Sequence, residues 1–294
     1  MEIQQARVFL AVAREGSFSA AARRLYRTQP TITMAVQKLE HELGARLFER
    51  IPHGVRLTRA GQRLVESLGP LLEEWDRART RLQESADGVL RGPVHVGAGE
   101  AGILYLLPGP IRSFLRRHPR VDVVVRHRSA EETIAMLRQG EIDFALRALP
   151  EPPPDMAFFP FRTADRVLIA PRNHPVHRTR SLTLEGLARH PFILPWPGAA
   201  SRKLIEGLFA ERGLPLKVSL EAGGWETIKR YAGLGLGIAV VPDFCLEQAD
   251  RRLAVRPARN LFGQDTYGIV TKRGRELSPA ARALVAEIAP EAQG

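Results

Sequence analysis

The sequence predicts a mostly α-helical winged helix-turn-helix at the N-terminus, then a long linker helix, then an α/β region. Three observations support this prediction. Residues 18–39 contain two short capped helical segments, residues 59–87 carry an apolar stripe at helical spacing, and strand patterns alternate with helix patterns from residue 94 onward. The 294 residues exceed a typical single domain, so more than one folding unit is expected.

The charge balance favours a polyanionic partner. The chain carries 43 Lys and Arg against 32 Asp and Glu, a net charge of +11. Residues 1–63 hold 11 of those cations and 5 of those anions, so more than half of the net charge lies on a small N-terminal part. A basic unit of this kind is typical of proteins that bind nucleic acid.

The stretch FSAAARRLYRTQPTITMAVQKL predicts two short helices joined by a tight turn. Ser19 is expected to cap the first helix and Thr28 the second, with Pro30 in the first turn of the second. Apolar residues at helical spacing predict the buried side of the second helix: Ile32, Val36, Leu39 and Leu43.

Polar residues of the second helix lie mostly off that stripe. Short amide, hydroxyl and cationic side chains can read base edges or hold phosphates. The residues of this helix predicted to contact DNA are Thr28, Gln29, Pro30, Thr31, Thr33, Gln37 and Lys38. An ordinary surface helix with a solvated polar face is the alternative that the residue types alone leave open.

The flanking segments complete a winged unit. Residues 3–14 are expected to form a helix packed behind the pair. Two short extended runs, 45–50 and 55–58, flank a Pro-Gly turn and predict a hairpin wing. Arg50, Arg56 and Thr58 are the residues of this wing predicted to contact DNA.

An ordered set of residues runs from Ala21 to Gly61: Ala21-Ala22, Leu25, Thr28-Gln29-Pro30, Thr33, Leu39-Glu40, Leu43-Gly44, Leu47-Phe48, Arg50, Leu57-Thr58 and Ala60-Gly61. This set resembles the N-terminal motif of LysR-type transcriptional regulators. The resemblance implies a winged helix-turn-helix over residues 1–58 that binds double-stranded promoter DNA sequence-specifically.

Residues 59–90 are expected to form a linker. Its helix is capped by Thr58 and extends to about Asp87. Its apolar stripe consists of Leu64, Leu68, Leu71, Leu72, Trp75, Ala78 and Leu82. An exposed helix with such a stripe needs a partner. The resemblance implies a homodimer through this helix, and a homotetramer; packing of the stripe on its own chain is the alternative. Pro70 predicts a bend or interruption.

The alternating pattern after residue 93 predicts a parallel sheet. Expected helices include 104–118, 131–139, 201–212, 227–234 and 278–288, and the expected strands include 166–170. The resemblance implies a two-lobed, periplasmic-binding-protein-like effector domain over residues 93–294. Lobe I would comprise 93–162 and 267–294, and lobe II 163–266. A small-molecule effector would bind between the lobes, where strand ends and helix N-termini converge.

The resemblance places effector contacts in the segments that follow the first two strands and Leu194. The expected residues are Gly99, Glu100, Ser129, Arg147, Trp196, Ser201, Arg202 and Trp225. Glu100 stands where many relatives have a hydroxyl, so sulfate is not expected as the effector. A carboxylate in a closed cleft needs a partner. Glu100 is expected to pair with Arg147 or Arg202, or to receive a ligand's amino or hydroxyl groups; an outward, solvated Glu100 is the alternative.

Enzyme motifs do not occur in the sequence. It has no Gly-x-Ser-x-Gly elbow, no phosphate loop and no Cys/His cluster with metal spacing. His174 and His177 lie in a Pro-flanked loop and are read as loop histidines. We therefore expect neither catalysis nor a metal or cofactor.

The remaining features predict a soluble, cytoplasmic protein. Cys245 is the single cysteine and is read as a buried thiol in a reducing compartment. No signal peptide and no apolar run of bilayer length is visible, so no membrane partner is expected. The main alternative function is a small-molecule binding protein whose N-terminal unit mainly dimerises.

Overall fold

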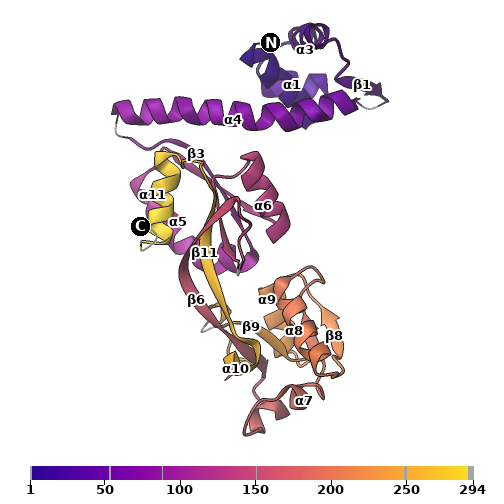
Figure 1. Ribbon diagram of the computed structural model, residues 1–294, viewed down its shortest axis with the longest axis vertical. Coiled ribbons are helices and arrows are strands. Elements are labelled where there is room, and N and C mark those ends of the chain that lie inside the picture. The colour runs from indigo at the N-terminus through magenta and orange to yellow at the C-terminus, as the bar shows by residue number, and fades with distance from the viewer. Residues whose placement is uncertain (1, 53, 88, 150, 248–249, 291–294) are drawn as a thin grey trace. The chain divides into compact units, whose positions relative to one another are not determined.

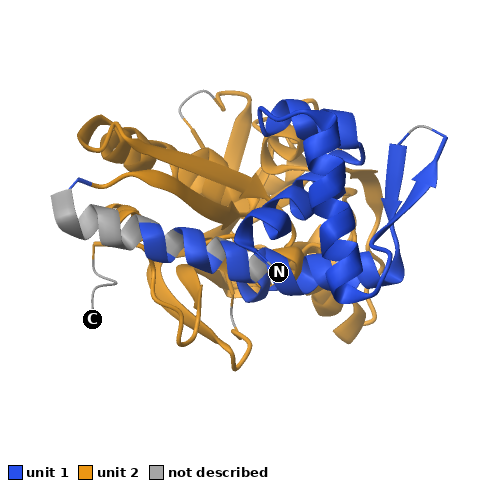
Figure 2. Ribbon diagram, turned by 90° about the horizontal axis from the view of Figure 1, so that it is seen from above, with its two compact units in different colours: residues 1–89, 135–141 blue, residues 90–134, 142–294 orange. Residues whose placement is uncertain are grey.

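The structure is a computed structural model that describes residues 2–52, 54–87, 89–149, 151–247 and 250–290. The chain forms two compact units, residues 1–89 with 135–141 and residues 90–134 with 142–294 (Figure 2). The first unit contains the helical N-terminal part, and the second contains most of the α/β part.

The N-terminal part has the element order of a winged helix-turn-helix followed by a long helix (Figure 1). Its elements are α1 (Ile3–Glu15), α2 (Phe18–Arg24), α3 (Gln29–Leu43), β1 (Phe48–Ile51), β2 (Gly54–Leu57) and α4 (Arg59–Asp87). β1 and β2 pair antiparallel, with Phe48 opposite Leu57, and form the predicted wing.

Three residues of the predicted α3 stripe are buried, and one is not. Ile32, Val36 and Leu39 pack in two small cores shared with α1, α2 and the wing. Leu43 is 44% exposed, so its predicted burial is wrong. It is the last residue of the helix, and the chain turns away at Gly44, which ends the helix in the left-handed conformation with φ 62°.

The cap of α2 also differs from the prediction. The Ser17 hydroxyl accepts from the Ala20 N–H at 3.3 Å, while the Ser19 hydroxyl donates to Gln29 Oε1 at 3.1 Å. The predicted Ser19 cap is therefore wrong. Phe18 packs against the core beside α1 and α3, which favours a helix start two residues earlier than expected.

α4 runs as one helix through Pro70, so the predicted interruption is wrong (Figure 1). A proline removes one helical hydrogen bond, whose acceptor here would be the carbonyl of Glu66. Glu66 is exposed, so water can satisfy that carbonyl. Leu68 and Leu72 pack in the N-terminal core and hold the helix on both sides of the proline.

The elements of the α/β part, including α6, whose last turns are assigned to the first unit, follow in this order: β3 (Gly92–Ala98), η1 (Gly102–Leu106), α5 (Pro108–Arg117), β4 (Val121–His127), α6 (Ala130–Gln139), β5 (Phe144–Ala148), β6 (Met156–Pro171), η2 (Pro175–Arg178), α7 (Leu184–Leu187), β7 (Phe192–Leu194), α8 (Ala200–Glu211), β8 (Val218–Glu221), α9 (Trp225–Gly233), β9 (Ala239–Pro242), η3 (Asp243–Cys245), β10 (Leu253–Pro257), α10 (Arg259–Phe262), β11 (Gln264–Lys272) and α11 (Pro279–Ile288). Helices alternate with strands through most of this part, as predicted.

Two long strands connect the lobes. The first part of β6 pairs with β11, and its end, Arg166–Pro171, pairs with β9 and β10. In lobe I, β3 pairs parallel with β4 and β5, and in lobe II β7 pairs parallel with β8. Figure 1 shows β6 and β11 running from one lobe to the other. The sheets are therefore mixed and not purely parallel as predicted, because β11 pairs antiparallel with β5 in lobe I, and β9 and β10 pair antiparallel with β6 in lobe II.

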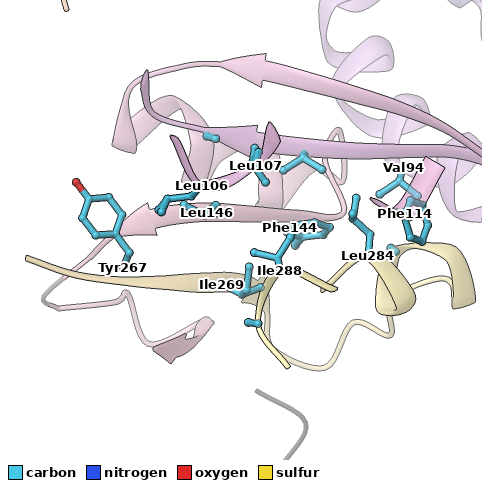
Figure 3. Packing of buried hydrophobic residues seen from close by; sticks show 14 of the residues in the cluster. Val94, Leu106, Leu107, Phe114, Phe144, Leu146, Tyr267, Ile269, Leu284 and Ile288 are labelled. Carbon is cyan, nitrogen blue, oxygen red and sulfur yellow. The ribbon is translucent and has the colours of Figure 1, made fainter. Parts of the chain in front are cut away.

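The lobe I core lies between its sheet and the helices α5 and α11. Figure 3 shows Val94 of β3, Phe144 of β5, Ile269 of β11 and Leu284 of α11 in this cluster. Lobe II has its own cores around Phe192, Phe209 and Ile238 and around Ile193 and Ile228. Each lobe therefore has its own apolar centre.

Three local predictions in this domain were incomplete. The helix expected over 104–118 is split into a π-helical turn, η1, and α5, because Pro108 cannot donate a backbone hydrogen bond. The strand expected over 166–170 is the end of the 16-residue β6. β10 and α10 were not anticipated; both are short, and β10 carries exposed residues at the edge of the sheet.

Candidate DNA interface and effector cleft

The residues of α3 that were predicted to contact DNA lie together on the side of the helix away from the core. Gln29, Pro30, Thr31, Gln37 and Lys38 are exposed, as is the N-cap residue Thr28, and Thr33 is half-buried. The hydroxyl groups of this face are held by local hydrogen bonds. Thr28 and Thr31 share one at 2.8 Å, and the Thr33 hydroxyl donates to the Gln29 carbonyl at 3.0 Å.

Exposed cations surround this helix. Lys38 lies 3.4 Å from Glu2, and Arg56 of the wing lies 3.1 Å from Glu49. Exposed ion pairs of this kind stabilise a protein by about 0–1 kcal/mol, so both cations can exchange their partner for a phosphate. Arg27 and Arg50 are exposed and form no ion pair within the part of the chain that the structure describes.

A buried carboxylate joins the wing to α3. Glu40 is 8% exposed, and its Oε1 accepts from the backbone N–H groups of Leu47 at 2.7 Å and Phe48 at 3.3 Å. Its Oε2 faces Arg46 at 3.3 Å. This contact fixes the position of the wing relative to α3. Glu40 belonged to the sequence motif that carried the family resemblance, but it was not predicted as a site residue.

Thr58 occupies the same joint. Its hydroxyl donates to the Arg46 carbonyl at 2.7 Å and accepts from the Gly61 N–H at 3.0 Å, which caps α4 as predicted. Both bonds hold the wing against α4, so the geometry gives Thr58 a positioning role. Gly61 permits this close approach, because a Cβ there would lie 2.2 Å from the Leu47 carbonyl oxygen.

In the effector domain, Glu100 reaches from lobe I to lobe II. Its Oε2 accepts from the backbone N–H of Trp225, the first residue of α9, at 2.9 Å. Gly224 provides no side-chain cap there, and a Cβ at Gly224 would lie 2.3 Å from Glu100 Oε1. A carboxylate at a helix N-terminus is stabilised by the free N–H groups and the helix dipole. The expected pairing of Glu100 with Arg147 or Arg202 is wrong, and so is the outward orientation.

A second link between the lobes lies next to the first. The Tyr105 hydroxyl of η1 donates to Glu226 of α9, and Glu226 also lies 2.7 Å from Lys229. Burial raises the pKa of Tyr105, and its bond to Glu226 raises it further, so the phenol remains a donor. Neither Tyr105 nor Glu226 was predicted as a site residue.

Lys229 anchors this link from inside lobe II. It is 4% exposed, and its Nζ donates to Asp250 at 2.9 Å and to the Cys245 carbonyl at 2.7 Å. Burial lowers the pKa of Lys229, but the hydrogen bonds to Glu226 and Asp250 outweigh this effect and raise it overall. The ammonium group therefore stays charged and holds Glu226 in place.

Arg147 of β5 lies in lobe I next to Gly99. Its Nη1 donates to the Arg128 carbonyl at 3.1 Å, and a Cβ at Gly99 would lie 2.6 Å from that nitrogen. Burial lowers the pKa of Arg147, yet a guanidinium keeps its proton at neutral pH. Among the described residues, no carboxylate forms an ion pair with Arg147.

Ser129 caps α6 near Arg147. Its hydroxyl accepts from the Glu132 N–H at 3.2 Å, and its own N–H donates to Glu132 Oε2 at 2.9 Å. This reciprocal arrangement is a capping box. The Ser129 hydroxyl still has a proton to donate. Arg147 bonds to the carbonyl of the preceding residue, Arg128, and lies against Gly99, so Gly99, Ser129 and Arg147 are neighbours in lobe I.

The predicted lobe II residues are held by their own lobe. Arg202 donates to Glu206 at 2.7 Å and to Glu221 at 2.6 Å, and these bonds raise its pKa. Ser201 precedes it in α8 and is half-buried. Trp196 is 44% exposed, and its ring covers Gly198. Trp225, by contrast, packs against the cores of both lobes.

Comparison with known proteins gives two family matches. Residues 3–62 match the bacterial regulatory helix-turn-helix protein of the lysR family, and residues 87–293 match the LysR substrate binding domain. The chain belongs to the LysR family. It is a transcriptional regulator with an N-terminal helix-turn-helix and a two-lobed substrate-binding domain, as the sequence motifs implied.

Relatives match along nearly the whole chain. The RuBisCO operon transcriptional regulator of Allochromatium vinosum is 31% identical over 289 residues, covering 97% of this chain and 94% of that protein. The regulator CfxR of Cupriavidus necator is 32% identical over 242 residues, covering 82% of this chain and 75% of that protein.

Solved structures of the family have the same fold. A full-length OxyR variant from Pseudomonas aeruginosa has a TM-score of 0.75 at 28% identity and covers 98% of this chain and 94% of its own. CbnR complexed with its target DNA has a TM-score of 0.71 at 24% identity and covers 98% of this chain and 99% of its own. No helix in the described ranges has both the length and the hydropathy needed to cross a bilayer.

Proposed function

We propose that this regulator binds promoter DNA through α3 and the wing. The observation that carries this proposal is the exposed polar face of α3, which lies opposite its buried side and is accompanied by Arg27 and Arg50. The proposed contacts are Thr28, Gln29, Pro30, Thr31, Thr33, Gln37, Lys38, Arg50 and Arg56, with Thr58 positioning the wing. The two α3 helices of a dimer would enter successive major grooves, about 34 Å apart.

The exposed residues of α4 support a homodimer. Leu68 and Leu72 pack on the chain's own N-terminal core, whereas Leu71 is 65% and Trp75 is 53% exposed. We propose that these two residues pack against α4 of a second copy, and that dimers associate as tetramers. The side chain of Leu82 lies outside the described residues.

The salt dependence of DNA binding tests the first proposal. A duplex selected from a random library should bind with an affinity that falls steeply with salt, because phosphate contacts release counterions. Lys38→Ala and Arg50→Ala should each reduce the slope of log K against log salt by about two, because a dimer loses one phosphate contact per subunit. A protein that binds only small molecules, with an N-terminal unit for dimerisation, would retain no duplex.

We further propose that a small-molecule effector binds between the lobes. Gly99, Glu100, Ser129 and Arg147 would contribute from lobe I, and Trp196, Ser201, Arg202 and Trp225 from lobe II. The Arg147 guanidinium donates to the Arg128 carbonyl and forms no ion pair with a carboxylate among the described residues, which suits a ligand with an anionic group. A thermal-shift screen of organic acids should find such ligands, since a ligand at one hundred times its Kd adds about 2.7 kcal/mol.

The same proposal assigns binding, and not catalysis, to the cleft. The sequence lacks catalytic motifs, so the ligand should be recovered unchanged after prolonged incubation.

The proposed domain boundaries are residues 1–58 for the DNA-binding domain, 59–90 for the linker helix and 93–294 for the effector-binding domain. A regulator that binds bacterial promoters would act in the cytoplasm, where the chromosome lies.

A further inference from the structure

We infer that Met34 contacts a thymine methyl group in the bound DNA and thereby sets part of the sequence preference of this regulator. The inference rests on the proposed DNA-binding role of α3. Met34 is 69% exposed in the middle of that helix. Among the exposed large apolar side chains of the described residues, only Tyr26, at 96%, is more exposed.

The position of Met34 on the helix points it at whatever α3 binds. An α-helix turns roughly 100° per residue, so Met34 lies on the side opposite Val36 and Ile32, which are buried. The exposed residues nearest to it on the helix surface are polar or small: Pro30, Thr31, Gln37 and Lys38. Met34 is therefore an apolar centre within a polar face.

The chemistry of the side chain limits what it can recognise. A thioether has no hydrogen-bond donor and is a weak acceptor. Against a guanine, adenine or cytosine edge it would leave base groups without partners, which costs free energy. In the major groove only thymine presents an apolar group, its C5 methyl. An unbranched methionine side chain adapts readily to such a contact.

Deoxyuridine provides a direct test, because it keeps every hydrogen-bonding group of thymidine and lacks the methyl. The full-length chain first selects duplexes from a random double-stranded library at fixed salt. Each thymidine of a selected duplex is then replaced in turn, and affinities are measured by fluorescence anisotropy. We expect one position in each half-site at which the wild type loses about fourfold in affinity, the value for one buried methyl group.

Variants assign that loss to one residue. Met34→Ala should bind the thymidine and deoxyuridine duplexes equally, and Met34→Leu should keep the loss because it retains apolar surface. Gln37→Ala is the matched control on the same helix. It should weaken binding to both duplexes equally and leave the roughly fourfold difference between the thymidine and deoxyuridine duplexes unchanged. All three substitutions are at exposed positions, so an unchanged thermal unfolding midpoint will verify folding.

The outcomes separate this inference from the function on which it rests. If the wild type tolerates deoxyuridine at every position, or if Met34→Ala shows the same loss as the wild type, the methyl contact is refuted while DNA binding stands. If the chain selects no duplex at all, the proposed DNA-binding function itself is refuted.

Discussion

Glu40 and Glu100 both accept backbone N–H groups, but they join different kinds of parts. Glu40 is buried and holds the wing against α3 within one small unit, with contacts at 2.7 and 3.3 Å. Glu100 is half-buried and reaches from lobe I to the first residue of α9 in lobe II. The same chemistry acts within one small unit in the DNA-binding part and between two lobes in the effector domain. We therefore predict a rigid joint at Glu40 and a separable contact at Glu100.

Replacing Glu40 should have the largest effect. Glu40→Ala leaves the N–H groups of Leu47 and Phe48 without their partner in a buried site, so the unfolding free energy should fall by about 2–4 kcal/mol. DNA affinity should fall as well, because the wing loses its position. Chemical denaturation and anisotropy measure the two effects, and Glu40→Gln, which keeps one acceptor oxygen, should lose less of both.

Tyr105→Phe tests the second link between the lobes. It removes the hydroxyl that donates to Glu226 and keeps the ring packed beside Phe244. We expect a loss of about 1 kcal/mol in stability, because Glu226 keeps Lys229 as its partner. Effector affinity should change more than DNA affinity does. An equal change in both would contradict the separation of the two regions.

Glu100→Gln removes the charge at the α9 N-terminus and keeps an acceptor oxygen. The stability loss should be about 0.3–1 kcal/mol, the value for a helix-terminal charge. Small-angle scattering should detect a shift toward more open lobes. If scattering and effector affinity both remain those of the wild type, Glu100 has no part in lobe closure.

A smaller, pH-dependent effect is expected within lobe II. His174 and His190 lie with ring centroids 4.7 Å apart, and burial followed by neighbouring positive charge lowers the pKa of both. The unfolded chain then binds more protons than the folded one, so stability is complete above the ordinary pKa of 6.5 and falls below it. His190→Gln should flatten the dependence of melting temperature on pH between about 5 and 7.

Local sequence patterns predicted most of the elements, because caps, glycines and apolar periodicity act over short distances. Thr58 caps α4 as expected, and α4 has the expected bounds. Thr28 is the N-cap residue of α3 as expected, but its hydroxyl bonds to the Thr31 hydroxyl and not to a helix N–H. Ser17 rather than Ser19 caps α2, since the packing of Phe18 decided between two serines that have equal local propensity. Pro70 fits within α4, since water can reach the carbonyl of the exposed Glu66, and Leu68 and Leu72 pack on both sides of the proline.

Contacts between distant segments could not be read from the sequence. Glu100 has a backbone N–H as its partner, and Trp225 lies far along the chain. A glutamate can pair equally well with a backbone N–H or with an arginine, so the sequence could not distinguish the Trp225 N–H from Arg147 or Arg202. Both arginines have other partners. The family resemblance named Glu100 and Trp225 as residues of one site, and these two do meet, but their pairing depended on the three-dimensional arrangement.

Hydrogen exchange at two backbone amides tests the central comparison most directly. The Leu47 amide donates to the Glu40 carboxylate, and the Trp225 amide donates to the Glu100 carboxylate. In Glu100→Ala, the Trp225 amide should exchange at least about tenfold faster, corresponding to about 1.4 kcal/mol, while the Leu47 amide stays as protected as in the wild type. An unchanged Trp225 amide, or equal loss of protection at both, would contradict the distinction between a rigid joint and a separable contact.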